Sequence, residues 1–165
     1  MTINKKVTQQ LLDTILEKSQ LVKLGLVRVN LTDQSFATLL EYVRTSGLLE
    51  ELDLTWTEIG KQSWVPFFEW IKDNKRLKSV NISYNRIFHP DTQEESLGNL
   101  IHFIKRNKNL IHVDMTQCEL DEDVVLKIGA SLRKAAAIRA IHLCDNPGVN
   151  DEVVGQLITR IHAMP

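Results

Sequence analysis

The sequence predicts an α/β fold in which strand–turn–helix units repeat, with five parallel strands on one side and about six helices on the other. Two observations predict it. Five segments share one pattern of alternating apolar residues, and between them the apolar period changes from two to about 3.6 residues. The segments read LVKLGLVRVNL, LEELDLTWTEI, LKSVNISYNRI, LIHVDMTQCEL and IRAIHLCDNPGV. They start at 21, 49, 77, 110 and 138, so successive starts lie 28, 28, 33 and 28 residues apart.

Composition agrees with one folded domain. The 165 residues are 43% apolar and 25% charged, and the net charge of −1 gives no general attraction to nucleic acid or membranes. The N-terminus, MTINKKVTQQLL, has no apolar stretch typical of a secretory signal, and no apolar run is long enough to span a membrane. Cys118 and Cys144 form neither a disulfide framework nor a metal-ligand spacing. A reducing, cytoplasmic setting is therefore predicted.

Each repeated segment is predicted to be a strand with one buried side. In the third segment Val80 and Ile82 point into the core, while Ser79, Asn81 and Ser83 point outward. Where the chain leaves the strand, a side-chain amide can satisfy backbone groups that the sheet no longer pairs. The position is occupied, from the first repeat to the fifth, by Val29, Thr57, Asn85, Cys118 and Asn146.

The stretches between the strands are predicted to be helices, because their apolar residues fall at equivalent repeat positions with helical spacing. One further helix is expected at about residues 5–18. Asp33, Ser63, Asp121 and Asn150 are expected N-caps, and Asp91 with Glu94 has the spacing of a capping box. The inward-facing residues are expected to be Phe36, Leu39, Leu40 and Val43, then Trp64, Phe67, Phe68 and Ile71, then Leu97, Leu100, Ile101 and Ile104, then Val125, Ile128, Gly129 and Leu132, and at the ends Leu11, Leu12, Ile15, Val154, Leu157, Ile158 and Ile161.

These segments are close to L-x-x-L-x-L-x-x-N/C-x-L, the leucine-rich-repeat pattern. LEELDLTWTEIGKQSWVPFFEWIKDNKRL, residues 49–77, resembles the ribonuclease-inhibitor-like class of leucine-rich-repeat proteins over a whole repeat. The resemblance implies a right-handed curved solenoid with strands on the concave face and helices on the convex face. It also implies one domain over residues 1–165, either complete or a piece of a longer solenoid. Members of this family bind proteins on the concave face and the adjoining loops.

Stacked repeats turn sequence positions into columns, and two columns predict a partner-binding surface. One contains Gly25, Asp53, Asn81, Asp114 and His142, and the other contains Arg28, Trp56, Tyr84, Gln117 and Asp145. Trp56 and Tyr84 should be about 4.8 Å apart at the backbone, and exposed aromatics are enriched at binding hot spots. The insertion at 88–93, which contains His89, should lie beside them. The alternatives are rings that merely cover the sheet edge and a tolerated surface insertion. The expected partner-binding residues are Trp56, Tyr84, Asp53, Asn81, Asp114, His142 and His89.

A basic rim is the second candidate surface. Arg44, Lys72, Lys105 and Arg133 each lie five residues before the next repeat, and Lys75 and Lys108 lie two residues before it. Such cations can simply offset the helix dipole. Alternatively, they bind an acidic protein, phospholipid headgroups or nucleic acid. Because no aromatic column interleaves the rim, nucleic acid is disfavoured.

Catalysis and metal binding are disfavoured. Cys144, His142 and Asp114 are suitable residue types for nucleophilic catalysis, but side chains two apart on a strand are about 7 Å apart, and no oxyanion hole is expected there. His112, Asp114 and His142 would lie on an open surface without an enclosing second shell for a metal. We therefore predict no enzyme and no cofactor. A GTPase activator or a cytoskeletal-capping regulator remains a family-based alternative, and the open edge of the strand at 138–144 favours self-association.

Overall fold

Five short strands form one parallel sheet in the computed structural model, which describes residues 10, 12–14 and 20–162, with side chains described as far as residue 159. The strand order is β1-β2-β3-β4-β5, so chain neighbours are sheet neighbours. The register is the one that the repeat alignment predicts, because Leu24 pairs with Leu52, Leu52 with Val80, Val80 with Val113, and Val113 with Ile141. The prediction of five parallel strands is confirmed. Their bounds are β1 Lys23–Gly25, β2 Glu51–Asp53, β3 Ser79–Asn81, β4 His112–Asp114 and β5 Ala140–His142.

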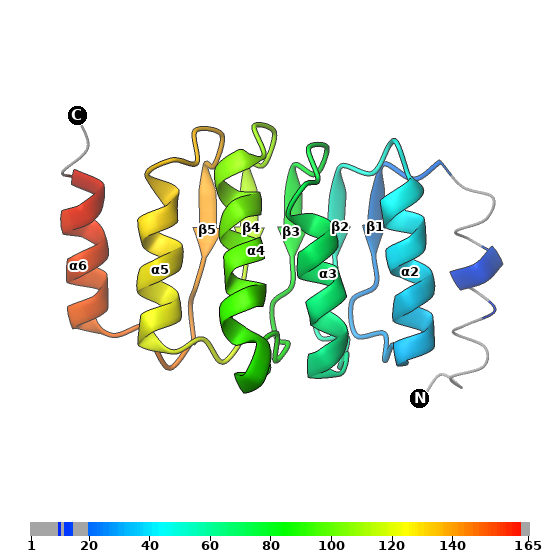
Figure 1. Ribbon diagram of the computed structural model, residues 1–165, viewed down its shortest axis with the longest axis horizontal. Coiled ribbons are helices and arrows are strands. Elements are labelled where there is room, and N and C mark those ends of the chain that lie inside the picture. Colours follow the sequence, from blue (N-terminus) through cyan, green and yellow to red (C-terminus); the bar gives the residue numbers. More distant parts are fainter. Residues whose placement is uncertain (1–9, 11, 15–19, 163–165) are drawn as a thin grey trace.

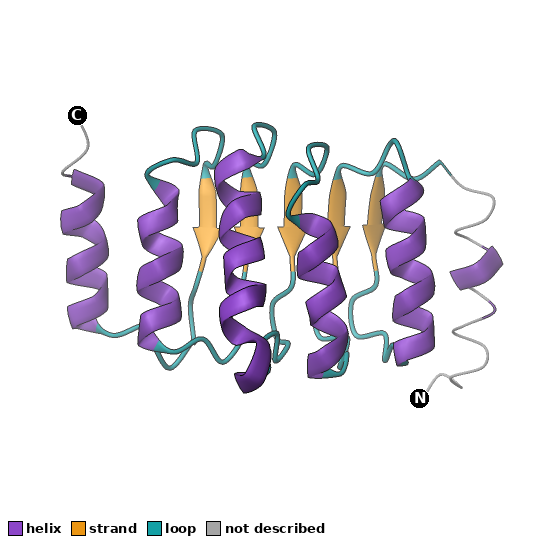
Figure 2. Ribbon diagram, viewed as in Figure 1, coloured by secondary structure: helices purple, strands orange, loops and turns teal. Residues whose placement is uncertain are grey.

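The helices cover one face of this sheet (Figure 1), and the two layers are distinct in Figure 2. We call the uncovered face the open face. The predicted N-terminal helix at 5–18 falls mostly outside the described residues, although residues 12–14 are helical and Leu12 is buried. The described helices are α2 Asp33–Thr45, α3 Trp64–Ile71, α4 Gln93–Arg106, α5 Glu122–Leu132 and α6 Asp151–His162, with short 3-10 turns η1 Lys61–Ser63 and η2 Pro90–Thr92.

The core lies between the layers and is richest in aromatic rings at α3. Trp64 is fully buried and packs edge-on against Phe67, with ring centroids 5.1 Å apart, and against Phe36 of α2 at 5.7 Å. Phe68 stacks on Phe88 at 5.4 Å, so the insertion before α4 begins with a residue packed against the helix layer. Repeats are therefore joined side by side by apolar contacts between neighbouring helices.

The predicted role of the asparagines is visible in the hydrogen bonds. Asn85 Nδ2 donates to the carbonyls of Leu54, Ile82 and Ser83, and its Oδ1 accepts from the N–H and hydroxyl of Thr57. Asn146 does the same two repeats further on, where it accepts from the N–H groups of Cys118 and Leu120 and donates to three carbonyls. These buried amides replace sheet pairing where the chain leaves the strands.

Several predicted helix starts need correction. α2 is capped by Thr32, whose hydroxyl accepts from the N–H of Ser35, while Asp33 accepts from the Ser63 hydroxyl. Ser63 precedes α3 without a side-chain capping bond. Asp91 forms no capping box, because it lies inside η2 and the chain begins α4 two residues later. Asp121 and Asn150 cap α5 and α6 as predicted, with bonds of 2.9 and 3.0 Å.

The buried face of α6 also differs from the prediction. Val153 is buried, whereas Val154 and Ile158, both predicted to face the core, are 39% and 49% exposed. In the inner helices the equivalent residues lie between two neighbouring helices. α6 lies at the C-terminal end of the row in Figure 1, and among the described elements its main contact is with α5. A residue on its outer side therefore has no described element to cover it.

Candidate functional site

A column of left-handed residues follows the ends of the strands. Arg28, Trp56, Tyr84, Gln117 and Asp145 have φ angles of 58°, 53°, 58°, 53° and 57°. Side chains other than glycine rarely adopt this conformation. It recurs because the N–H of each of the first four residues donates to a carbonyl of the next repeat at 2.9 to 3.1 Å, which extends the ladder beyond the strands. Sequence reasoning missed this conformation, since nothing in these residue types indicates it.

Three predicted partner-binding residues hold these turns in place. Asp53 Oδ1 accepts from the N–H and hydroxyl of Thr55 at 2.9 and 2.6 Å. Asn81 Oδ1 accepts equivalently from Ser83, and Asp114 Oδ1 accepts from the N–H of Thr116. Each bond fixes the backbone directly before a left-handed residue. The half-buried Asp53 and Asn81 therefore orient the chain that carries Trp56 and Tyr84.

Trp56 and Tyr84 form an exposed stacked pair, as their shared column predicts. Their ring centroids are 5.6 Å apart, their planes differ by 7°, and the side chains are 45% and 41% exposed. The guanidinium of Arg28 lies 5.2 Å from the Trp56 centroid. The pair occupies the edge of the sheet at which the strands end, the lower edge in Figure 1. It lines a hollow of about 370 Å³ together with Asn85, Arg86, Gln117, Glu119, Asp145 and Pro147.

The two predicted histidines do not join this hollow. His142 lies on β5, where its ring meets that of His112 edge-on at 5.1 Å, and His112 Nδ1 lies 2.9 Å from the Ser79 hydroxyl. His89 Nδ1 accepts from the N–H of Asp91 and so caps η2. The imidazole of His89 is therefore used locally, and it is not among the residues that line the hollow beside Trp56 and Tyr84.

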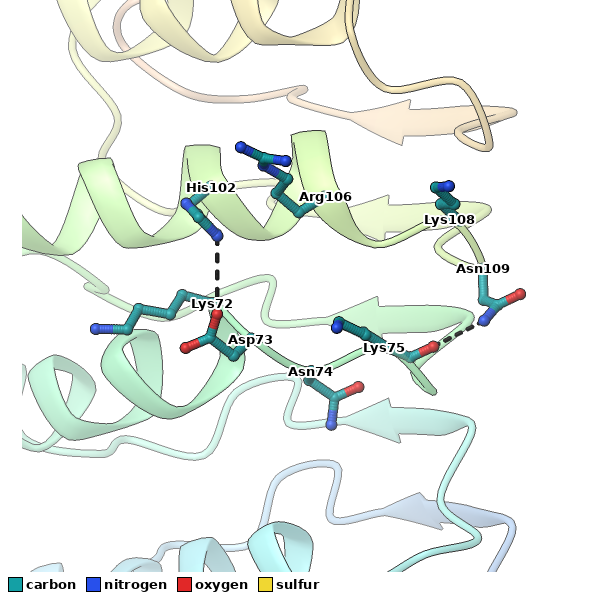
Figure 3. Close-up of a pocket in the computed structure, with 8 residues that line it drawn as sticks. All are labelled: Lys72, Asp73, Asn74, Lys75, His102, Arg106, Lys108 and Asn109. Carbon is teal, nitrogen blue, oxygen red and sulfur yellow. Dashed lines mark hydrogen bonds and ion pairs between the residues drawn. The ribbon is translucent and has the colours of Figure 1, made fainter.

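The predicted basic rim is only partly continuous. Lys72, Lys75 and Lys108 line one hollow of about 550 Å³ with Arg106, a residue that the repeat spacing did not single out (Figure 3). Arg44 instead pairs with Glu41 of its own helix at 3.1 Å. Lys105 and Arg133 are exposed and do not line this hollow. The remaining lining residues are Asp73, Asn74, His102 and Asn109.

The residues considered for catalysis and metal binding, Cys144, His142, His112 and Asp114, lie on or directly after β4 and β5. Within the described ranges, no three His, Cys, Asp or Glu side chains are placed to hold a metal. Cys144 is exposed, and no hydrogen bond joins it to His142 among the side chains that the structure describes. Cys118 is buried, and burial raises the pKa of its thiol to about 12. It is therefore not an activated nucleophile. No described helix is both long enough and apolar enough to cross a membrane.

Comparisons with known proteins match the fold and not the sequence. No protein-family model matches the chain, and no curated protein matches it. Among solved structures, the chain is similar to leiomodin-1 actin-binding site 2, with a TM-score of 0.69 and 12% identity over 92% of this chain and 87% of the other. It is also similar to the tropomodulin C-terminal domain of Caenorhabditis elegans, with a TM-score of 0.67 and 12% identity over 97% and 92%. The chain therefore has a leucine-rich-repeat-like α/β fold.

Proposed function

We propose that this chain is a non-enzymatic protein-interaction module that binds its partner with the open face of the sheet and the Trp56–Tyr84 edge. The stacked, exposed ring pair is the observation that carries the proposal. Two large aromatics held by a hydrogen-bonded backbone lose little conformational freedom on binding, which is what a hot spot requires. In the hollow beside the rings Glu119 is ion-paired with Arg86, so Asp145 is the lining acid that favours a basic group on the partner.

The proposal includes the specific class of leucine-rich-repeat fold that the sequence suggests. We infer a single right-handed solenoid of the ribonuclease-inhibitor-like class, with the open face on its concave side, because every repeat is a strand, a short turn and a helix. The unpaired state of Cys118 and Cys144 supports a reducing, cytoplasmic setting. A cytoskeletal role is the more specific form of the proposal, and actin is the first partner to test, since one structurally similar chain is named as an actin-binding site.

The test compares wild type with the double substitution Trp56→Ala/Tyr84→Ala in two assays. One is binding to monomeric and filamentous actin, and the other is capture of partners from cytosolic extract with identification by mass spectrometry. A true hot spot should lose at least about 30-fold in affinity, because such residues contribute about 2 kcal/mol or more each. Binding of the wild type should persist at moderate salt, since aromatic contacts are screened little.

The matched control is Ile111→Ala/Ile158→Ala, which removes two side chains of similar exposure, 47% and 49%, from other surfaces. This variant should bind like wild type. A partner that the aromatic variant retains and that moderate salt removes would contradict the proposal. An extract partner other than actin that depends on the rings would support the interaction module, and absence of wild-type binding to monomeric and filamentous actin would exclude actin as the partner of this surface.

A further inference from the structure

The basic hollow lies at the opposite edge of the molecule from the aromatic pair. It is formed where α3 and α4 end and the chain returns to β3 and β4. Figure 3 shows the segment 72–75 on one side and His102, Arg106 and residues 108–109 on the other. The hollow has a volume of about 550 Å³. It is large enough for several residues of a peptide.

The four cations of this hollow are Lys72, Lys75, Arg106 and Lys108. No ion pair involves Lys72, Lys75, Arg106 or Lys108 in the part of the chain that the structure describes, although other cations pair across repeats, as Lys78 does with Glu50 at 2.7 Å. The single acid of the hollow, Asp73, lies 3.7 Å from the imidazole of His102. The hollow therefore carries four positive side chains against one negative side chain.

Helix dipoles do not account for this charge. A cation offsets the dipole within the last turn of a helix, which describes Arg106 and, at the C-cap of α3, Lys72. Lys75 lies four residues beyond the end of α3, and Lys108 follows the C-cap Asn107 of α4. These two lysines are outside the range of the dipole effect, and yet they line the same hollow. A ligand of opposite charge gives all four cations a common partner.

We propose that the hollow binds an acidic segment of a partner protein, in which several Asp or Glu carboxylates contact separate cations. A compact phosphate group fits less well, because the hollow is lined by the ends of α3 and α4 and the segments after them, and not by a cluster of helix N–H groups that could surround it. Two amide groups of the lining form bonds within the protein. Asn74 Oδ1 accepts from two N–H groups, and Asn109 Nδ2 donates to the Lys75 carbonyl. A bilayer is flat and cannot follow a hollow, whereas an extended peptide can.

The experiment measures binding of a fluorescent oligo-glutamate peptide to the chain by anisotropy. Wild type should bind, and its affinity should fall about tenfold between about 50 mM and 200 mM salt. Lys72→Gln/Lys75→Gln/Lys108→Gln should lose about tenfold or more at low salt, since each exposed ion pair contributes modestly. Trp56→Ala/Tyr84→Ala should bind this peptide like wild type. The experiment therefore tests the basic hollow separately from the proposed partner-binding site at Trp56 and Tyr84.

The matched control is Lys23→Gln/Lys61→Gln/Lys127→Gln, which changes the net charge equally but lies outside the hollow. Thermal melts establish that each variant is folded, and Lys75→Gln alone, an exposed loop position, serves if the triple variant is not. An equal loss of peptide affinity in the control variant and in Lys72→Gln/Lys75→Gln/Lys108→Gln would overturn the proposal. Preferential binding of phosphatidylserine vesicles or of inorganic polyphosphate through the same three lysines would also overturn it. A wild-type dimer that the Lys72→Gln/Lys75→Gln/Lys108→Gln variant abolishes would do so too.

Discussion

Asn85 and Asn146 illustrate at the scale of one residue how this fold replaces lost sheet pairing. Removing the Asn85 amide takes away the acceptor of the buried Thr57 N–H, while the Leu54 carbonyl keeps the Thr57 hydroxyl and the Ile82 carbonyl keeps the Cys118 thiol as donors. Because a buried unsatisfied group costs roughly 1–3 kcal/mol, Asn85→Ala should lower the free energy of unfolding by about 1–3 kcal/mol. Urea unfolding measures this. Asn30→Ala removes an exposed bond to Glu58 and should change stability by less than about 0.5 kcal/mol. Equal effects of the two substitutions would show that burial of the amide is unimportant.

The two thiols should differ in reactivity, because only one of them is accessible. At pH 8, Cys144 should react with an aromatic disulfide reagent while Cys118 stays protected until the chain unfolds. Burial raises the pKa of the Cys118 thiol from 9.0 to about 12. Between these values the unfolded thiol ionises and the folded thiol does not, so the unfolding free energy should fall as pH rises above 9.

Cys118→Ser isolates this contribution, because serine does not titrate in that range. The difference in unfolding free energy between wild type and variant should therefore shrink as pH rises. A difference that is constant with pH would contradict the raised pKa, and rapid labelling of both thiols in the native chain would contradict the burial of Cys118.

At the scale of the helices, two glycines should respond oppositely to alanine. A Cβ on Gly129 of α5 would overlap with Cδ2 of Leu157 of α6, whereas a Cβ on Gly98 of α4 meets nothing within 4 Å. Gly98→Ala should stabilise by about 0.5–1 kcal/mol, the usual helix preference of alanine. Gly129→Ala should destabilise by about 1 kcal/mol, since the Leu157 side chain must leave its present position between α5 and α6. Thermal unfolding measures both, and combining Gly129→Ala with Leu157→Ala should cost less than the sum. Additive effects would show that the two residues do not meet.

The strands and helices were predictable because apolar spacing records which side of each element is buried. Leu52, Val80 and Val113 fell on the core side, and the Trp56–Tyr84 contact followed from the repeat length alone. What was missed depends on neighbours in space. The outward Val154 follows from the absence of a described element beyond α6, and the left-handed φ of Trp56 follows from pairing with the next repeat. Arg106 lines the basic hollow because the C-terminal ends of α3 and α4 lie side by side. The spacing of residues within one repeat does not predict this contact between two repeats.

The whole molecule is a row of units in which each element packs on its chain neighbours, as α3 does on α4 and β2 on β3. The free energy of local opening should then differ from one repeat to the next along the row. Ile141 of β5 is half-buried, whereas Val113 of β4 is 1% exposed, and β5 pairs on one side only. We therefore expect amides of β5 and α6 to exchange through a local opening of lower free energy than the amides of β2 to β4.

Two truncations of buried side chains test this gradient by native-state hydrogen exchange. Val153 of α6 and Phe67 of α3 are 0% and 1% exposed, so each truncation leaves a cavity. Val153→Ala should reduce protection in α6 and β5 and leave β2 to β4 nearly unchanged, because the end unit can open by itself. Phe67→Ala should reduce protection in β2 to β4 as well, because α3 packs on both α2 and α4 and so joins the units on either side. If Val153→Ala instead lowered protection equally in all strands, the chain would unfold as one cooperative unit and the end unit would not open by itself.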